Sequence, residues 1–524
     1  MNSIGKYYPA AIATVLLCVL VAVLYPYCKY YVDPDATAYL TIAQRYADGD
    51  ITKAINGYWS PFSCWLTAIF IKAGWKAFMG AVVTNTIAAI GFMWVSASLF
   101  IRFRIKTYFQ FALCLAQAVF LSYAVYQQLF ADLWECFFLL LSLRLLLSNE
   151  YVHHKWMWVL NGAIGALAFF AKAYSFPFFI AHMAGCGFII HKGWQRESRR
   201  QWIQYSLVSI STMILLSLPW IYLLHDKYGI WMTSTAGRLN TSWYLVGHPY
   251  FKESIGHLLP PVYANSPYYW EDPYMANGVT PHFWNSPQLF ILQVVKAGYN
   301  FLKFIISGSE ISAFYLLTWL LAVTMMLSKK TRHLWGDKSL LLGFSFVLFP
   351  LGFIIINYEA RYIWYTLPLS MVVGALALQK MLLHIDRQKI IGNIAIALFA
   401  FSYVVHPLWD MRSMVNEGRN EYGLSQVLKE NNIQGSFASN LNHAPEVRKA
   451  IRLAYFAGCP YYNMPFGADD KELLAEMRRY KVKYYFYWPS TYTDNFAPAD
   501  EHGQPFKYIE PDEKSSLKIF LINP

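Results

Sequence analysis

Residues 8–28 read YPAAIATVLLCVLVAVLYPYC, and residues 30–50, almost directly after them, read YYVDPDATAYLTIAQRYADGD. An apolar run of about 20 residues is long enough to cross the hydrocarbon core of a bilayer as a helix. The second stretch places two carboxylates, Asp33 and Asp35, on either side of a proline. The chain therefore leaves a predicted membrane span and at once presents two acids.

Apolar runs of this kind recur along the chain. Of its 524 residues, 56% are hydrophobic and 14% charged, whereas a soluble protein carries about 25% charged residues. The pattern predicts a polytopic α-helical membrane protein with about eleven transmembrane helices. We expect the spans at about 8–27, 77–100, 108–125, 132–149, 157–172, 174–191, 203–224, 311–328, 339–356, 363–383 and 390–407.

Basic residues gather in alternate loops between these runs. They are Arg102, Arg104 and Lys106; Lys155; Lys192, Arg196, Arg199 and Arg200; Lys329, Lys330, Arg332 and Lys338; and Arg387 and Lys389. By the positive-inside rule this pattern predicts a cytoplasmic N-terminus. Membrane topology then accounts for the net charge of +12, which does not indicate nucleic-acid binding. Two outer loops, at about 28–76 and 225–310, and everything after about 408 are expected on the opposite side.

The chain changes character after residue 408. Residues 421–433, 445–458 and 469–479 have helical patterns, whereas 435–440, 481–488 and 515–524 read as strands. We expect two domains: a transmembrane domain at 1–408 and a soluble extracytoplasmic α/β domain at 409–524. Because the second contains no phosphate-binding glycine loop, its expected role is structural or in docking an acceptor.

Seven charged residues stand at or near the predicted outer ends of spans. Charges at such positions are costly unless they are paired or face an aqueous cavity, so we expect a cavity that holds them together. They are Asp33, Asp35, Asp132, Glu135, Lys172, Glu359 and Arg361.

Each of these residues also has a simpler interpretation. Lys172 and Arg361 could snorkel to the interface at a helix end. Asp35 could cap a surface helix that begins at Ala36, and Asp132 could favour the dipole of its helix. The alternative is that the two cations bind an anion such as a lipid phosphate, for which the planar donors of arginine are well suited. An aspartate nearby could then take a proton from an attacking acceptor.

Several motifs resemble those of the GT-C glycosyltransferases, especially the protein O-mannosyltransferase and lipid A aminoarabinose transferase group. The resemblance covers about 30–370 and depends on the order of loose motifs. They are DPDATAYLTIAQRYADGD at 33–50, NGYWSPF at 56–62, GAIGALAFFAKAYSFP at 162–177, LLSLPWIYLLHDKYG at 215–229 and YEARYIWYTLPL at 358–369.

The resemblance implies a transferase that moves a sugar from a polyprenyl-phosphate carrier to an extracytoplasmic lipid, glycan or protein. Asp35 would be the general base, with Asp33 able to share that role, and Lys172 and Arg361 would hold the donor phosphate. The family often has a glutamate where this chain has Ala36. A second carboxylate must then come from elsewhere, and Asp33, Asp132 and Glu135 are candidates. Glu359 is a further supporting acid, and the expected substrate cavity includes Tyr39, Tyr58, Trp59 and Tyr362.

Three questions stay open at this level. DPD also resembles the metal-binding DxD motif, so a divalent cation at Asp35 is an alternative to a reaction without a cofactor. A transporter or flippase of lipid-linked saccharides would share the charged cavity, although no internal repeat is visible. The absence of an ER retrieval signal at the end of the sequence favours a bacterial inner membrane, but it identifies neither sugar nor acceptor.

Overall fold

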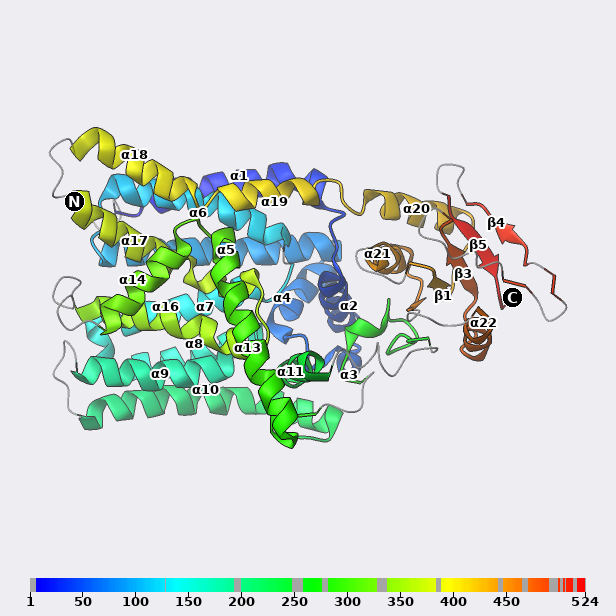
Figure 1. Cartoon of the computed structure of the whole chain (residues 1–524), viewed down its shortest axis with the longest axis horizontal. Helices are drawn as coiled ribbons and strands as arrows, with labels where there is room; N and C mark the ends of the chain where they lie inside the picture. Colours follow the sequence, from blue (N-terminus) through cyan, green and yellow to red (C-terminus); the bar gives the residue numbers. More distant parts are fainter. Residues whose placement is uncertain are drawn as a thin grey trace.

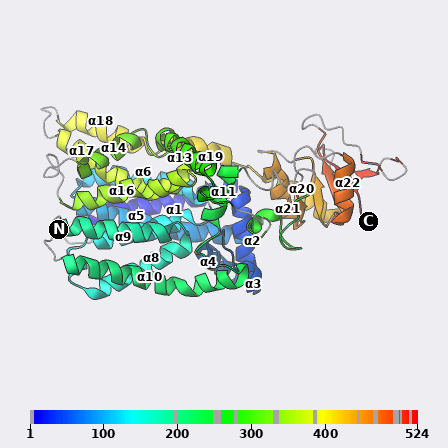
Figure 2. The same cartoon turned by 60° about the horizontal axis from the view of Figure 1, so that its bottom comes forward.

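The computed structural model describes residues 6–127, 129–192, 199–246, 258–275, 281–327, 337–382, 388–441, 446–463, 470–489, 498–499, 503–504, 506–511 and 516–523. Most of the first 414 residues form a bundle of long helices, and a smaller domain projects from one end of it (Figures 1 and 2). The bundle helices are α1 (Tyr8–Cys28), α5 (Ala77–Arg102), α6 (Thr107–Gln127), α7 (Asp132–Leu146), α8 (Lys155–Ala171), α9 (Ser175–Lys192), α10 (Arg199–Tyr228), α14 (Tyr315–Leu327), α16 (Asp337–Ile355), α17 (Leu367–Leu382), α18 (Gln388–Phe401) and α19 (Val405–Met414).

Every one of the eleven predicted spans contains a helix. Within the described residues, eight helices are both long and apolar enough to cross a membrane: Tyr8–Cys28, Ala77–Arg102, Thr107–Gln127, Ile203–Tyr228, Pro287–Glu310, Lys338–Ile355, Ala360–Leu382 and Ile390–Glu430. Several of the others are short. The 15 residues of α7, for example, reach about 22 Å at 1.5 Å per residue. The lengths and compositions of the described helices therefore do not confirm eleven full-length spans.

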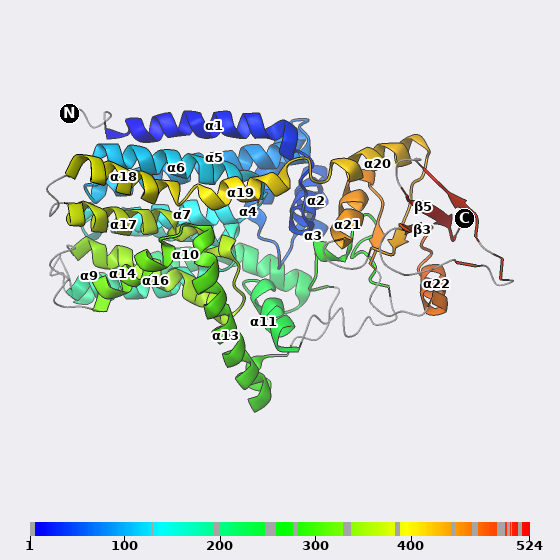
Figure 3. The same cartoon turned by 45° about the horizontal axis from the view of Figure 1, so that its top comes forward.

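One long helix lies where we expected an outer loop. Residues 287–307 form α13 (Pro287–Ser307), an apolar helix of 21 residues that runs obliquely to the bundle (Figure 3). Its polar side chains attach it to the end of α16, because Gln293 Nε2 donates to Ile355 O and Asn300 Nδ2 donates to Ile354 O. In the sequence, this apolar segment is flanked by polar and aromatic residues, which conceal its length and composition as a possible span.

Among the described residues, basic side chains from two of the predicted loops lie together at one end of the bundle. Arg102 Nη2 donates to Leu147 O at 2.5 Å and to Asn149 Oδ1 at 2.9 Å, and Lys338 Nζ donates to the same Asn149 oxygen. The loop that joins α5 to α6 therefore lies beside the end of α7 and the start of α16. The opposite end carries the polar site and the smaller domain (Figure 1). Which end faces the cytoplasm stays a prediction.

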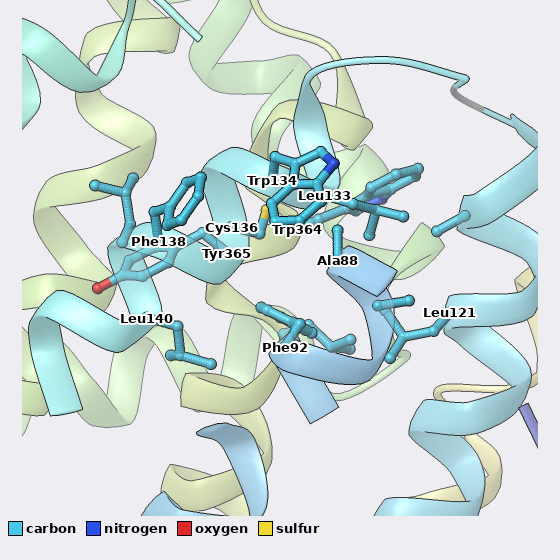
Figure 4. Close-up of a cluster of buried hydrophobic side chains, with 14 of the residues drawn as sticks. Ala88, Phe92, Leu121, Leu133, Trp134, Cys136, Phe138, Leu140, Trp364 and Tyr365 are labelled. Atoms are coloured by element: carbon cyan, nitrogen blue, oxygen red, sulfur yellow. The ribbon is translucent and has the colours of Figure 1, made fainter. Parts of the chain in front are cut away.

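The middle of the bundle is filled by apolar and aromatic side chains from four elements. Figure 4 shows Trp134 and Phe138 of α7 beside Phe92 of α5, Leu121 of α6 and Trp364 of η6 (Ala360–Thr366). Trp134 and Phe138 stack with 5.5 Å between ring centroids, and Phe120 packs edge-on against Trp364. The first contact lies within α7 and the second joins α6 to η6, and α7 itself also lies against η6. Both α7 and η6 carry charged residues at the polar end.

Short helices cover that polar end. They are α2 (Pro34–Asp48), α3 (Ile51–Ala54), α4 (Pro61–Lys72) and α11 (Ala236–Val246). The expected surface helix is α2, but residues 36–40, 42, 43 and 45 are all buried, so the helix is covered on most of its sides. Its position against α4 and α5 turns its N-terminus toward the interior of the molecule.

The C-terminal domain has the predicted α/β composition. Its helices are α20 (Arg419–Glu430), α21 (Val447–Ala457) and α22 (Asp470–Arg479), and its strands are β1 (Phe437–Ser439), β2 (Tyr461–Tyr462), β3 (Tyr484–Tyr487), β4 (Tyr508–Ile509) and β5 (Lys518–Leu521). In the described part of the domain the strand order is β2-β1-β3-β5-β4. The strand β1 is parallel to β2 and β3, and β5 is antiparallel to β3 and β4. The helix α19 crosses the expected boundary at 408, and the chain enters the domain after Met414.

Candidate active site

A cavity of about 430 Å³ lies at the polar end of the bundle, between α2, α11, η6 and the ends of α7, α8 and α16. Its charged lining consists of Asp35, Asp132, Lys172, Glu359 and Arg361. Five of the seven charged residues singled out in the sequence therefore meet in one cavity, although they come from four separate segments. Asp33 and Glu135 are not part of the lining.

The two aspartates of the DPD motif have different positions. Asp33, and not Asp35, caps α2, because its carboxylate accepts a hydrogen bond from Ala36 N at 2.6 Å. Pro34 takes the first helical position, where its missing N–H costs nothing. Asp35 is left free of the capping role and lies in the first turn, at the cavity wall.

Asp35 is held from two sides. Its Oδ2 lies 3.0 Å from Nη2 of Arg361, and its Oδ1 accepts a hydrogen bond from the indole Nε1 of Trp270 at 3.1 Å. The side chain of Asp35 is 23% exposed and that of Arg361 is 14% exposed, so the pair borders the cavity without being sealed off. The carboxylate is thus oriented and accessible to a bound molecule.

Arg361 is shared between two acids. Its Nε donates to Glu359 Oε2 at 2.6 Å, while Nη2 contacts Asp35. The hydroxyl of Tyr362 donates to the other oxygen of Glu359 at 3.2 Å. Glu359 is 44% exposed, so it is the partner of Arg361 that can turn toward solvent most easily.

Lys172 ends α8 and faces a second pair of acids. Its ammonium pairs with Asp132 and lies 3.7 Å from Oε2 of Glu135. Glu135 also accepts a hydrogen bond from Ser175 Oγ at 3.0 Å. The ammonium stands 4.1 Å from the ring centroid of Tyr362. Lys172 and Arg361 therefore point into the polar cavity, which is not the geometry of side chains that snorkel to the membrane surface.

Aromatic side chains form the rest of the wall. Tyr39 stacks on Phe130 with 4.6 Å between ring centroids and packs edge-on against Trp59 at 5.1 Å. Tyr58 hydrogen-bonds Asn240 of α11 at 3.0 Å and packs against Trp270. The predicted cavity residues Tyr39, Tyr58, Trp59 and Tyr362 all belong to this lining.

Sequence reasoning missed Trp270 as a partner of Asp35. It lies among many aromatic residues of the loop 225–310, and nothing in its local sequence distinguishes it from its neighbours. The two acids that follow Trp270 in the sequence are both buried in ion pairs, Glu271 with Arg45 and Asp272 at 3.0 Å from Lys227. These ion pairs attach the loop to α2 and α10.

Burial raises the pKa of the Asp33 carboxyl to about 7, and the negative charge of the neighbouring Asp35 adds to this effect. Both influences disfavour the ionised form of Asp33. The hydrogen bond from Ala36 N opposes them but does not reverse the direction. Near neutral pH, Asp33 is thus a group that gains and loses a proton.

The surroundings of Asp35 do not suit a divalent cation. Both carboxylate oxygens of Asp35 accept from nitrogen donors, Trp270 and Arg361. Among the described residues, no group of three or more His, Cys, Asp or Glu side chains is arranged to hold a metal ion. We therefore derive no step through a metal.

A second cavity of about 410 Å³ adjoins the first. Glu359 and Arg361 line both cavities and so form the wall between them. The far side of the second cavity carries Tyr123, whose hydroxyl donates to Asp410 at 2.7 Å, and His406, which lies 3.8 Å from Glu310. Of the Asp35–Arg361 pair, Arg361 therefore borders both cavities, whereas Asp35 borders the first.

No protein-family model and no curated protein matches the sequence. Solved structures do match the fold. ArnT from Cupriavidus metallidurans, bound to undecaprenyl phosphate, superposes with a TM-score of 0.57 at 12% identity, over 100% of this chain and 98% of that one. An apo structure of the same ArnT gives 0.55 at 12% identity, over 98% and 97% of the two chains.

The oligosaccharyltransferase of Archaeoglobus fulgidus, in complex with zinc and sulfate, matches with a TM-score of 0.54 at 13% identity, over 91% of this chain and 67% of that one. At such low identity the likeness shows the fold alone. The chain is a multi-pass membrane protein with the GT-C fold, and the fold class expected from the sequence is confirmed.

Proposed function

We propose that this GT-C protein is an integral-membrane glycosyltransferase that moves a sugar from a polyprenyl-phosphate donor to an extracytoplasmic acceptor. The observation that carries the proposal is the Asp35–Arg361 ion pair at the wall of a cavity that also contains Lys172. A base and two cations within one cavity are the groups that such a transfer requires. The match to ArnT with undecaprenyl phosphate bound supports a lipid-phosphate donor.

Lys172 and Arg361 would bind the donor phosphate. Cations in a site of low dielectric must be neutralised, and without an anion the surrounding carboxylates do this. Glu359 is the most exposed of them, so a phosphate can replace it at Arg361 while Asp35 stays in contact with Nη2. The two cations would then stabilise the charge that develops on the departing phosphate.

Asp35 would act as general base. In a single displacement, the acceptor oxygen or nitrogen forms a bond to the anomeric carbon as the bond from that carbon to the phosphate oxygen breaks. The acceptor proton passes to Asp35, the bonding electrons leave with the phosphate, and the anomeric configuration inverts. Asp132 and Glu135 hold Lys172 in place from behind.

The second cavity would admit the acceptor. Because Arg361 and Glu359 line both cavities while Asp35 lines the first, an acceptor in the second cavity would have to extend past this shared wall to reach the carboxylate. The aromatic and acidic lining of the second cavity, with Tyr123, His406 and Asp410, suits the hydroxyl or amino groups of a polar acceptor.

The test is transfer by the purified protein in liposomes, with a panel of undecaprenyl-phosphate-linked sugars as donors. We expect Asp35→Asn to lower kcat by about 10²–10⁴-fold, the usual contribution of a general base. Asp48→Asn, at the exposed C-terminal end of the same helix, is the matched control and should keep full activity. Full activity in Asp35→Asn would exclude this residue as the base. If the wild type transfers no sugar but exchanges such lipids between leaflets, it is a flippase.

Phosphate binding is tested separately with undecaprenyl phosphate itself. Lys172→Ala and Arg361→Ala should each weaken its affinity by about 10-fold or more, because each removes a charge-assisted hydrogen bond. Lys53→Ala provides the control, since Lys53 is 41% exposed and pairs with Asp50 on the short helix α3. Size-exclusion chromatography confirms that each variant is folded. Unchanged affinity in both cavity variants would contradict the phosphate site.

A further inference from the structure

We infer that the C-terminal domain holds the catalytic carboxylate in position, with Trp270 and Arg452 as positioning residues. The inference rests on the proposed function of Asp35. It assigns the domain a part in building the active site, which is a more specific role than the docking of an acceptor.

Three hydrogen bonds fix the chain immediately around Asp35. Arg452 Nε donates to Val32 O at 2.9 Å, Tyr268 OH donates to Pro34 O at 2.6 Å, and Trp270 Nε1 donates to Asp35 Oδ1 at 3.1 Å. All three donors lie far along the sequence from the DPD motif. Together with the Arg361 contact they leave the Asp35 carboxylate with a partner on each oxygen.

The loop that supplies Tyr268 and Trp270 is built into the C-terminal domain. Leu259 and Asn463 exchange backbone hydrogen bonds at 3.0 and 3.2 Å, and Tyr461 N donates to Pro267 O at 2.7 Å. Tyr268 and Tyr269 are buried in the apolar core of the domain together with residues of β1, β2 and α21. A displacement of the domain would therefore move the indole that contacts Asp35.

Arg452 is the second link. It lies on α21, which the views place between α2 and the sheet (Figures 1 and 3). Its side chain is 4% exposed and pairs with Glu417, with Glu421 at 3.9 Å. A buried guanidinium with two acidic partners is held rigidly, so the bond that it donates to Val32 O fixes the start of α2.

The linker before α20 packs closely against the chain just before the DPD motif. Asn416 N donates to Tyr27 O at 2.8 Å, and Tyr30 packs against Tyr422 with 4.9 Å between ring centroids. Gly418 has φ +82°, and a Cβ at that position would lie 2.2 Å from Tyr30 O. Only glycine allows this approach, which brings the linker against the chain just before the DPD motif.

Kinetics with a conservative variant test the inference. Trp270→Phe keeps an aromatic ring but removes the N–H donor, and we expect kcat to fall by about 10-fold or more, because a hydrogen bond to a charged group is lost. The affinity for undecaprenyl phosphate should change less than twofold, since the proposed phosphate contacts come from Lys172 and Arg361. Wild-type kcat in Trp270→Phe, or an equal loss of phosphate affinity, would overturn the inference.

Hydrogen exchange tests the same link without an activity assay. In Arg452→Gln, the amides of residues 33–40 should exchange faster than in the wild type. Arg479→Gln, an exposed arginine of α22 that pairs with Glu476, should leave them unchanged. Equal exchange in Arg452→Gln and the wild type would refute the positioning role. If the wild-type protein transfers no sugar at all, the proposed function fails, whereas the exchange result still decides whether the domain fixes this segment.

Discussion

Asp33 and Asp35 differ in position because of helix geometry. Asp33 lies just outside the helix with extended backbone (φ −83°, ψ 172°), whereas Asp35 lies in the first turn, after Pro34 at the first helical position. Asp33 therefore turns back to cap the helix, whereas Asp35 points into the cavity. The two acids of the DPD motif thus have different roles: Asp33 is structural, and Asp35 is the proposed catalytic residue.

The pKa of Asp33 makes the stability of the protein depend on pH. This pKa is raised to about 7 from the ordinary aspartate value of 3.8, so the folded state binds a proton more tightly than the unfolded chain does. The stabilisation is complete below about pH 4 and is lost as the pH rises through 7. Asn at this position stays uncharged and also caps helices well.

We therefore expect the Tm of the wild type, relative to that of Asp33→Asn, to fall between pH 5 and pH 8 in detergent. After a discount for the partly exposed side chain, the loss is on the order of 2 kcal/mol, from the relation of about 1.4 kcal/mol per pKa unit. Melting curves of both proteins at the two pH values provide the measurement. A constant difference in Tm would contradict the raised pKa.

At the scale of elements, the position of Lys172 depends on how closely α8 approaches α10. Gly162 lies at the contact, and a Cβ there would stand 2.4 Å from Ser209 O and 2.6 Å from Thr212 Cβ. Ser209 Oγ donates to Trp158 O at 2.9 Å, which joins the same two helices. Because Lys172 directly follows α8, the packing along this helix decides where its ammonium lies.

Gly162→Ala should separate α8 from α10. We expect a loss of about 1–3 kcal/mol in stability, as for other overpacked contacts, and a weaker affinity for undecaprenyl phosphate. Gly423→Ala is the matched control, because no atom lies within 4 Å of the added Cβ and alanine favours a helix. Thermal melting and lipid binding measure both effects, and a Gly162→Ala protein as stable as the control would show that the two helices adjust without cost.

At the scale of the whole molecule, the two ends of the bundle are chemically different. In the described part of the chain, one end has the basic residues Arg102 and Lys338, and the other has the C-terminal domain (Figure 2) and the acidic and aromatic cavity. Positive loops stay on the cytoplasmic side during insertion. The cavity is therefore expected on the outer side, where a sugar-linked lipid would meet an extracytoplasmic acceptor.

Cysteine labelling measures this topology. In a cysteine-free variant expressed in a bacterium, a membrane-impermeant maleimide should label Ala475→Cys, which is exposed on α22. It should leave Thr107→Cys, exposed at the start of α6, unlabelled until the cells are permeabilised. The reverse pattern would place the cavity in the cytoplasm and contradict an extracytoplasmic acceptor.

Local sequence patterns identified the bundle helices and the main α/β elements. The length of an apolar run and helical periodicity depend on neighbouring residues, so they can be recognised from the sequence alone. The same patterns failed for α13, which has the length and composition of a span although it lies in a region rich in polar and aromatic residues. They also allowed Asp35 as the cap of α2, whereas Asp33 caps it, because a shift of two residues in a helix start cannot be read from propensity.

The sequence by itself determined the membrane class, the GT-C resemblance and the charged residues that belong at the polar end. Hydrophobic length and the cost of charge in a membrane act on each segment separately, which is why these features were predictable. The tertiary structure alone decided the pairing of Asp35 with Arg361, of Lys172 with Asp132, and of Trp270 with Asp35. Such pairs join segments up to hundreds of residues apart, and their contacts depend on how helices and domains pack in three dimensions.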